Sequence, residues 1–187
     1  MIINLLTIRK YVENLEVRLG EWDVSSDVEL LQHESYSVSE IETNPNYDNN
    51  TLINDIAILT LTETVQNEPH ISPVCLPSPR EQFQASSCVV TGWGNREPLM
   101  KETFVDCLDD EECQNRLRAT KLGSGYKLNS NFMCATAKGG QSCLIDGGSP
   151  LVCQRKDGSY ALVGLVSWAV DCDDATVPEA YVRVSFR

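Results

Sequence analysis

The segment LIDGGSPLVC at residues 144–153 has the residue types that surround a catalytic serine. Asp146 precedes a tight glycine turn, and Ser149 and Pro150 then lead into an apolar run that ends at Cys153. Acyl transfer at such a turn needs a serine oxygen, a histidine that takes its proton, an aspartate that orients the histidine, and N–H groups around the oxyanion. The position expected for the nucleophile holds Gly147, which has no side chain. The first question is therefore whether this chain is an enzyme.

The elements that must position this turn are mostly strands. Short runs of alternating apolar and polar residues, bounded by Gly, Pro, Asn or Asp, predict strands at 15–19, 37–42, 55–61, 87–93, 150–153, 160–168 and 180–186. One helix is expected at 109–122, because acidic residues open this segment, basic residues follow, and Gly123 is a C-terminal stop signal. This pattern favours an all-β barrel or sandwich. The proline-containing run at 66–84 is expected to connect two β lobes.

Composition and charge exclude some classes of function. The 187 residues carry a formal net charge of −12, and no Lys/Arg run offsets it, so nucleic-acid binding is not expected. No apolar stretch approaches the ~20 residues that a membrane span requires.

Cysteine content indicates an oxidising compartment. The chain has eight cysteines, and no two of them form a C-x-x-C pair, so disulfides explain them better than zinc or thioredoxin chemistry. The sequon Asn49-Asn50-Thr51 lies in a turn-rich run and predicts a glycan on Asn49. The N-terminal MIINLLTIRK lacks the features of a signal peptide. We therefore expect a fragment of a longer secreted precursor.

Six ordered motifs resemble a chymotrypsin-like (trypsin-fold) serine protease domain. They are NDIAIL at 54–59, PVCLP at 73–77, CVVTGWG at 88–94, FMCA at 132–135, DGGSPLVC at 146–153 and VGLVSW at 163–168. The resemblance covers nearly the whole chain from about Leu15. It implies a single domain over 1–187 with two β-barrels: a partial first barrel at 1–65, a connection at 66–84 and a second barrel at 85–187. It also implies that the start of the first barrel and the terminal helix are missing.

Within that family, the chain is similar to the clip-domain serine protease homologues of arthropods, the group of prophenoloxidase-activating cofactors and masquerade-like proteins. The segments that suggest this are VRLGEWD at 17–23, the run from Val38 to Leu59, and the Gly-Gly-Ser order in DGGSPLVC. Those homologues resemble proteases without cleaving peptides, and they regulate protease cascades in melanisation and immunity.

The resemblance implies a degenerate catalytic site. Gly147 replaces the nucleophilic serine, and Ser149 lies two residues too far along the turn to act in its place, because even a ~1 Å displacement costs ~100-fold in rate. The family's catalytic histidine lies in a T-A-A-H-C motif that this chain lacks. His33 and His70 are both outside that motif and are expected in loops.

The remaining aligned positions are altered or lack a partner. Asp55 matches the triad aspartate and is expected to have a structural role, with its carboxylate held by local backbone donors. Ile145 replaces an oxyanion-hole glycine, where a β-branched residue is costly. Asp146 matches the residue that receives the new amino terminus when active relatives are cleaved, and this chain has no such start sequence.

The resemblance also implies an altered substrate pocket. Its aligned residues are Gln141 at the pocket base, Ser167, Trp168 and Ala169 on one wall, and Glu179 in place of a glycine. Because a buried carboxylate without a partner is costly, we expect Glu179 to face water or to pair with a cation, and the pocket to be blocked.

Family pairing implies the disulfides Cys88–Cys153, Cys113–Cys134 and Cys143–Cys172. Cys75 and Cys107 have three alternatives: they pair with each other, remain free, or bind another chain. No metal is expected at the catalytic site. The acidic loop that follows Leu19 is expected to be a solvated loop without a metal. Calcium binding is the weaker alternative, with the candidate ligands Glu21, Asp23, Asp27, Glu29 and Glu34.

The sequence thus predicts a secreted, non-catalytic protease homologue that binds protein partners of an extracellular cascade. Three alternatives remain open at this stage. The first is an active trypsin-like endopeptidase, the second is a module that recognises microbial surfaces or receptors, and the third is a truncated relic with no function.

Overall fold

The structure is a computed structural model, and it describes residues 2–3, 15–79, 81–85, 87–94, 98–139, 146–172 and 174–184. Three of the residues singled out above, Gln141, Cys143 and Ile145, lie outside these ranges. The expectations that rest on them stay predictions.

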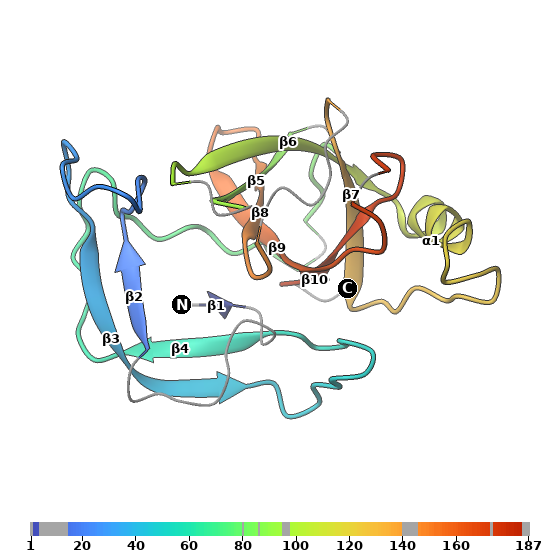
Figure 1. The fold of residues 1–187 in the computed structure, drawn as a ribbon, viewed down its shortest axis with the longest axis horizontal. Coiled ribbons are helices and arrows are strands. Elements are labelled where there is room, and N and C mark those ends of the chain that lie inside the picture. The colour runs from blue at the N-terminus through green and yellow to red at the C-terminus, as the bar shows by residue number, and fades with distance from the viewer. Residues whose placement is uncertain are drawn as a thin grey trace.

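A four-stranded antiparallel sheet forms the N-terminal lobe (Figure 1). Its strands, in spatial order, are β1 (Ile2–Ile3), β4 (Ala57–Leu61), β3 (Glu34–Thr43) and β2 (Glu16–Leu19). Alternation along the strands turns Val17, Val38 and Leu59 inward, where they form the core of this lobe.

A closed six-stranded barrel forms the C-terminal lobe (Figure 1). Around the barrel the strands are β10 (Glu179–Arg183), β7 (Phe132–Ala137), β6 (Lys101–Leu108), β5 (Cys88–Gly92), β8 (Pro150–Gln154) and β9 (Tyr160–Trp168). Val90, Leu151 and Tyr181 fill its interior and are each at most 1% exposed. Closure of the barrel pairs both edges of each of its described strands, whereas the described strands of the N-terminal sheet form no closed ring. The expected all-β architecture is confirmed, with a closed barrel and a second sheet, while the incompleteness of the first barrel stays a prediction.

The helix is shorter than predicted. It spans Asp110–Arg118, and the Asp109 side chain caps it by accepting a hydrogen bond from the Glu112 N–H. At its end the Ala119 N–H turns back to two helix carbonyls, and the Thr120 hydroxyl donates to the Leu117 carbonyl. These local bonds end the helix before Gly123, which has a φ of +79° in a later turn.

Two barrel strands, β6 and β7, were not predicted. The β6 sequence KETFVDCL carries charges that interrupt the apolar alternation, and the β7 sequence FMCATA has no apolar–polar alternation and only one β-branched residue. Their pairing with each other and with β5 and β10 supplies the missing barrel wall.

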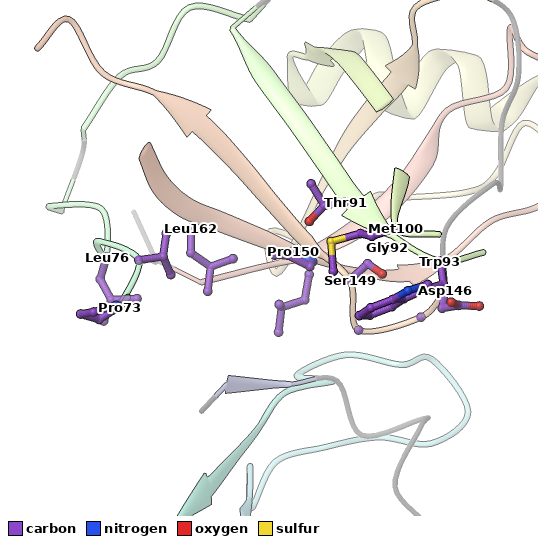
Figure 2. A pocket seen from close by; sticks show the side chains of 14 residues that line it. Pro73, Leu76, Thr91, Gly92, Trp93, Met100, Asp146, Ser149, Pro150 and Leu162 are labelled. Carbon is purple, nitrogen blue, oxygen red and sulfur yellow. The ribbon is translucent and has the colours of Figure 1, made fainter. Parts of the chain in front are cut away.

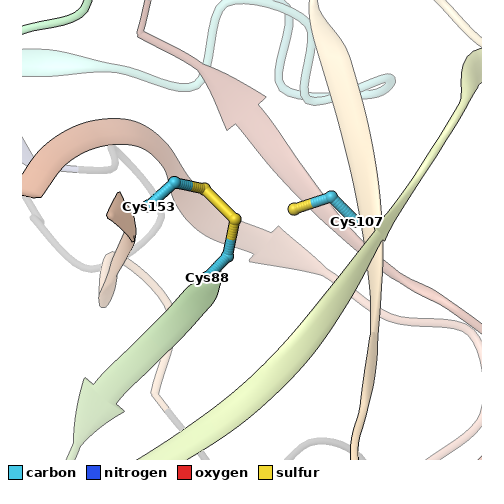
Figure 3. A group of neighbouring side chains, drawn as sticks. All are labelled: Cys88, Cys107 and Cys153. Carbon is cyan, nitrogen blue, oxygen red and sulfur yellow. A yellow bond between two sulfur atoms is a disulfide. The ribbon is translucent and has the colours of Figure 1, made fainter. Parts of the chain in front are cut away.

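Two predicted disulfides are present, Cys88–Cys153 and Cys113–Cys134. Cys172 is also disulfide-bonded, and its predicted partner, Cys143, lies outside the described residues. Cys75 and Cys107 are free thiols, so the alternative that they pair with each other is wrong. The Cys107 sulfur lies inside the barrel, within 4.8 Å of both sulfurs of the Cys88–Cys153 bond (Figure 3).

Candidate functional site

The turn before β8 holds residues that are predicted to match a catalytic loop. Gly148 adopts a φ of +89°, a conformation that favours glycine, and its N–H donates to the Val166 carbonyl at 2.8 Å. The Ser149 N–H donates to the Asp146 carbonyl at 3.1 Å and closes the turn. Gly147 lies at the exposed tip and offers no side-chain oxygen.

The Asp146 carboxylate is used as a structural acceptor. Its Oδ2 atom accepts a hydrogen bond from the Gly94 N–H at 3.0 Å. Gly94 follows β5, so this bond ties the turn before β8 to the end of a neighbouring strand.

Asp55, which is predicted to match the triad aspartate, is fully buried. Its Oδ2 atom accepts a hydrogen bond from the Ser167 hydroxyl at 2.8 Å, although 112 residues separate the two. Ser167 is itself only 6% exposed. Local backbone donors were expected for Asp55. The Ser167 donor is instead a side chain on β9 of the other lobe.

Both histidines have partners around the loop that connects β2 and β3. The His33 Nδ1 atom lies 3.0 Å from Glu21 Oε2, and the His70 Nε2 atom lies 2.9 Å from the Gln32 carbonyl. His70 also packs against Gly20, where an added Cβ would lie 2.3 Å from the ring. Both imidazoles therefore serve contacts within the first lobe and its connection.

The site thus keeps the aspartate and its serine donor, but the described residues do not assemble a nucleophile with a base. Gly147 cannot attack a carbonyl, and each histidine is held by a partner other than Asp55. Acyl transfer requires these groups to be in mutual contact.

Among the described residues predicted to line the substrate pocket, Ser167 and Trp168 lie on β9, Ala169 follows that strand, and Glu179 lies on β10. Trp168 makes edge-to-face contacts with Tyr126 and Phe132, with ring centroids 6.3 and 5.6 Å apart respectively. Trp168 and Ala169 line a cavity of about 610 Å³ beside Leu52 and Ile53.

Glu179 lies on β10 and accepts a hydrogen bond from the Tyr181 hydroxyl at 2.8 Å. Burial raises the pKa of Tyr181 well above 10, and the nearby Glu179 charge adds to this effect. The phenol therefore stays protonated and donates to Glu179. The expectation of water or a cation beside Glu179 did not include this donor.

A second cavity, of about 730 Å³, borders the turn before β8. Ser149, Asp146 and Trp93 lie at one end, and Pro73 and Leu76 from the connection lie at the other (Figure 2). Most of its lining is apolar, and sequence reasoning did not identify it because its lining residues come from four separate parts of the chain.

The acidic loop after β2 brings together only part of the set of candidate calcium ligands. Ligand atoms of Glu21, Glu29 and His33 lie within 4.8 Å of one another. The other three acids lie outside this group. Asp23 accepts hydrogen bonds from Ser25, Glu34 accepts one from the Tyr36 hydroxyl, and Asp27 is exposed.

A closed β-barrel paired with a second β-sheet, with a buried aspartate and serine joining the two lobes, defines a chymotrypsin-like protease domain. Residues 6–187 match the trypsin family, and the chain belongs to that family.

Its relatives include proteins named as inactive. The chain is 39% identical over 180 residues to the inactive CLIP domain-containing serine protease A28 of Anopheles gambiae. That alignment covers 92% of this chain and 47% of the relative. It is 35% identical over 195 residues to phenoloxidase-activating factor 2 of Galleria mellonella, and that alignment covers 96% of this chain and 64% of the relative. It is 37% identical over 201 residues to the inactive CLIP domain-containing serine protease A3 of Aedes aegypti, and that alignment covers 98% of this chain and 42% of the relative. The chain thus spans between about two fifths and two thirds of the length of these relatives.

Proposed function

We propose that this chain is a non-catalytic serine protease homologue that regulates an extracellular proteolytic cascade of the immune, melanisation type. The observation that carries the proposal is the exposed turn at Gly147, where the fold presents a backbone without a nucleophile. Removal of a serine nucleophile or its histidine from a triad lowers kcat on the order of a million-fold, and this site lacks both in working position.

The relatives support the choice of pathway. Two of the three relatives described above carry the word inactive in their names, and the third is named a phenoloxidase-activating factor. A domain that keeps a protease fold without turnover retains a shaped surface that partner proteins can bind. We therefore assign the chain a cofactor role, with proteins of a protease cascade as partners.

An extracellular location is part of the proposal. Two disulfides are formed among the described residues, which fits an oxidising compartment. The sequon places Asn49 and Thr51 on an exposed turn, where a glycan is sterically acceptable. Among those same residues, no helix combines the length and apolar character that crossing a membrane requires.

Two assays test the proposal. Purified protein is first incubated with peptide substrates and with a fluorophosphonate probe, with trypsin as the positive control, and neither turnover nor labelling is expected. The protein is then added to a reconstituted prophenoloxidase activation reaction, where it should raise or lower phenoloxidase yield without cleaving peptides itself.

The alternatives predict other results. Turnover that depends on Ser149 would establish an active endopeptidase, and a relative from Drosophila melanogaster that is 33% identical is named a serine protease, filzig. Binding to microbial polysaccharide without an effect on the cascade would identify a recognition module.

A further inference from the structure

Three sulfur atoms lie together inside the barrel. The Cys107 sulfur is within 4.8 Å of both sulfurs of the Cys88–Cys153 disulfide (Figure 3). Cys88 is fully buried, Cys153 is 1% exposed, and Cys107 is a free thiol that packs against the core of the barrel. Burial keeps dissolved thiols and reductants away from this bond, whereas Cys107 is already beside it.

The order of the strands determines which sulfur Cys107 reaches. β5 begins at Cys88 and lies between β6 and β8 in the barrel. Cys88 is opposite Val105 of β6, and Cys107 lies two residues further along β6, so its side chain is on the same face as that of Val105. Cys153 is on β8, at the other side of β5. Cys107 therefore meets Cys88 first, and Figure 3 shows its sulfur directed toward the disulfide.

We propose that Cys107 exchanges with the Cys88–Cys153 disulfide, so that the barrel has a second disulfide arrangement, Cys88–Cys107. The Cys107 thiolate attacks the Cys88 sulfur and forms a new sulfur–sulfur bond. The Cys88–Cys153 bond breaks, and Cys153 leaves as a thiolate that takes up the proton given up by Cys107. One disulfide and one thiol are present before and after the step, so the exchange requires no oxidant or reductant.

The new bond requires a small movement of two strand ends. Diagonal neighbours on paired strands have Cα atoms roughly 7–8 Å apart, and a disulfide needs about 4.4–6.8 Å, so the strands must approach by about 1–2 Å. Cys88 is the first residue of β5, and Cys107 is the last but one of β6. Strand ends open at a lower free energy than strand centres, so the movement does not require the barrel to unfold.

Burial controls how often the exchange starts. It raises the pKa of the Cys107 thiol to about 11, and Asp106 on β6 adds to this effect while Arg183 on β10 opposes it. The Tyr181 phenol on β10 also interacts with Cys107, and its own raised pKa keeps it protonated. A thiolate of high pKa is rare but strongly nucleophilic, and this one is held beside its target. The exchange is therefore slow near neutral pH and faster as pH rises.

The exchange changes what holds the exposed turn at Gly147. β8 begins at Pro150, directly after that turn, and the Cys88–Cys153 bond ties it to β5. In the second arrangement β5 is tied to β6 instead, and β8 keeps its hydrogen bonds to β5 and β9 without the cross-strand disulfide. The fold thus contains a device that loosens this face of the barrel without cleavage of the chain.

The test follows the disulfides of the folded protein over time at pH 7.5 and at pH 9.5. A Cys75→Ser background removes the exposed free thiol, which could otherwise take part. Samples are unfolded in acidic guanidinium chloride with N-ethylmaleimide, which traps free thiols, and are digested with pepsin for mass spectrometry. Circular dichroism establishes that the protein stays folded at both pH values. In addition, Cys153→Ser and Cys88→Ser are treated with the thiol oxidant diamide, and they form a matched pair because each removes one sulfur of the same disulfide.

At pH 9.5 we expect a growing fraction of Cys88–Cys107 peptide with the maleimide on Cys153. It should form about 100-fold faster than at pH 7.5, because below the pKa each pH unit raises the thiolate fraction about tenfold. Diamide should join Cys88 to Cys107 in Cys153→Ser and should leave Cys107 unpaired in Cys88→Ser. The proposal is overturned by any one of three results: maleimide on Cys107 alone after prolonged incubation, a bond from Cys107 to Cys153, or exchange of Cys113 and Cys134 at the same rate, which indicates unfolding.

Discussion

The Ser167 hydroxyl donates a 2.8 Å hydrogen bond to the Asp55 carboxylate, and this bond joins the two lobes inside a fully buried setting. Asp55 precedes β4 of the N-terminal sheet, and Ser167 lies near the end of β9 in the barrel. In a protease of this fold the aspartate orients a histidine. Here the aspartate is part of the interface between the lobes, and this structural role does not depend on a histidine partner.

Substitution of Ser167 by alanine should destabilise the fold. The variant removes a donor from a buried carboxylate, and such a loss costs about 1–3 kcal/mol. Ser159→Ala is the matched control, because the Ser159 hydroxyl donates to a carboxylate on the exposed surface. Urea unfolding should show a loss of that size for Ser167→Ala and a change within about 0.5 kcal/mol for the control. Equal effects would show that the buried bond has no special weight.

Restoring a serine at position 147 should not restore peptidase activity. A hydroxyl at this exposed turn still lacks a base, since His33 is held by Glu21 and His70 by the Gln32 carbonyl. Gly147→Ser protein should therefore show neither fluorophosphonate labelling nor turnover, as judged by mass spectrometry and a fluorogenic peptide. Stoichiometric labelling at residue 147 would mean that a histidine reaches the turn after all.

Sequence patterns predicted a strand of this fold when one or both of its faces are buried. They missed a strand when charged residues interrupt its apolar residues. The β9 sequence YALVGLVSW is recognisable as a buried strand on its own. By contrast, β6 includes Lys101, Glu102 and Asp106, and it is a strand because two neighbours pair with it in a closed barrel. No local window of sequence contains that information.

The candidate site divides in the same way. Asp55 and Gly147 could be identified from motifs, because their neighbours in sequence carry the signal. The donor to Asp55 and the Tyr181 partner of Glu179 depend on side-chain directions set by tertiary packing. The grouping of His33 with Glu21 and Glu29 depends on the path of an irregular loop, which has no periodic pattern to read.

Substitution of Gly20 by alanine should destabilise the fold because the new Cβ meets the His70 ring. Comparison with Gly123 separates this contact from the backbone strain. Gly20 and Gly123 have nearly equal φ values of +76° and +79°, so alanine carries a similar backbone strain of about 1–2 kcal/mol at both. Only at Gly20 would the new Cβ meet another side chain, 2.3 Å from the His70 ring. We expect Gly20→Ala to unfold at lower urea than Gly123→Ala, by about 1–3 kcal/mol in stability. Matching losses would mean that His70 moves aside freely.

The two free thiols should differ sharply in reactivity. Cys75 is exposed, whereas burial, aided by the negative charge of Asp106, raises the pKa of the Cys107 thiol to about 11. At pH 8 only about 0.1% of Cys107 is then thiolate, the form that reacts. Ellman's reagent should titrate one thiol quickly in the native protein and none quickly in Cys75→Ser. A fast equivalent in that variant would show that Cys107 is accessible and ionised.

Because the pKa of the Cys107 thiol is raised in the folded chain, we expect the protein to lose stability at alkaline pH. The ordinary pKa of a cysteine is 9.0, and Cys107 reaches about 11 in the folded chain, so the unfolded chain releases this proton first as pH rises. Stability from this group is therefore fully present below pH 9 and declines above it, by about 2 kcal/mol at pH 10.5. Other groups also titrate in this range, and the comparison with Cys107→Ala isolates the thiol. The difference in unfolding free energy between the two proteins, measured by urea titration from pH 8 to 10.5, should shrink as pH rises. A constant difference over that range would mean that Cys107 ionises equally in both states and that the barrel interior does not desolvate it.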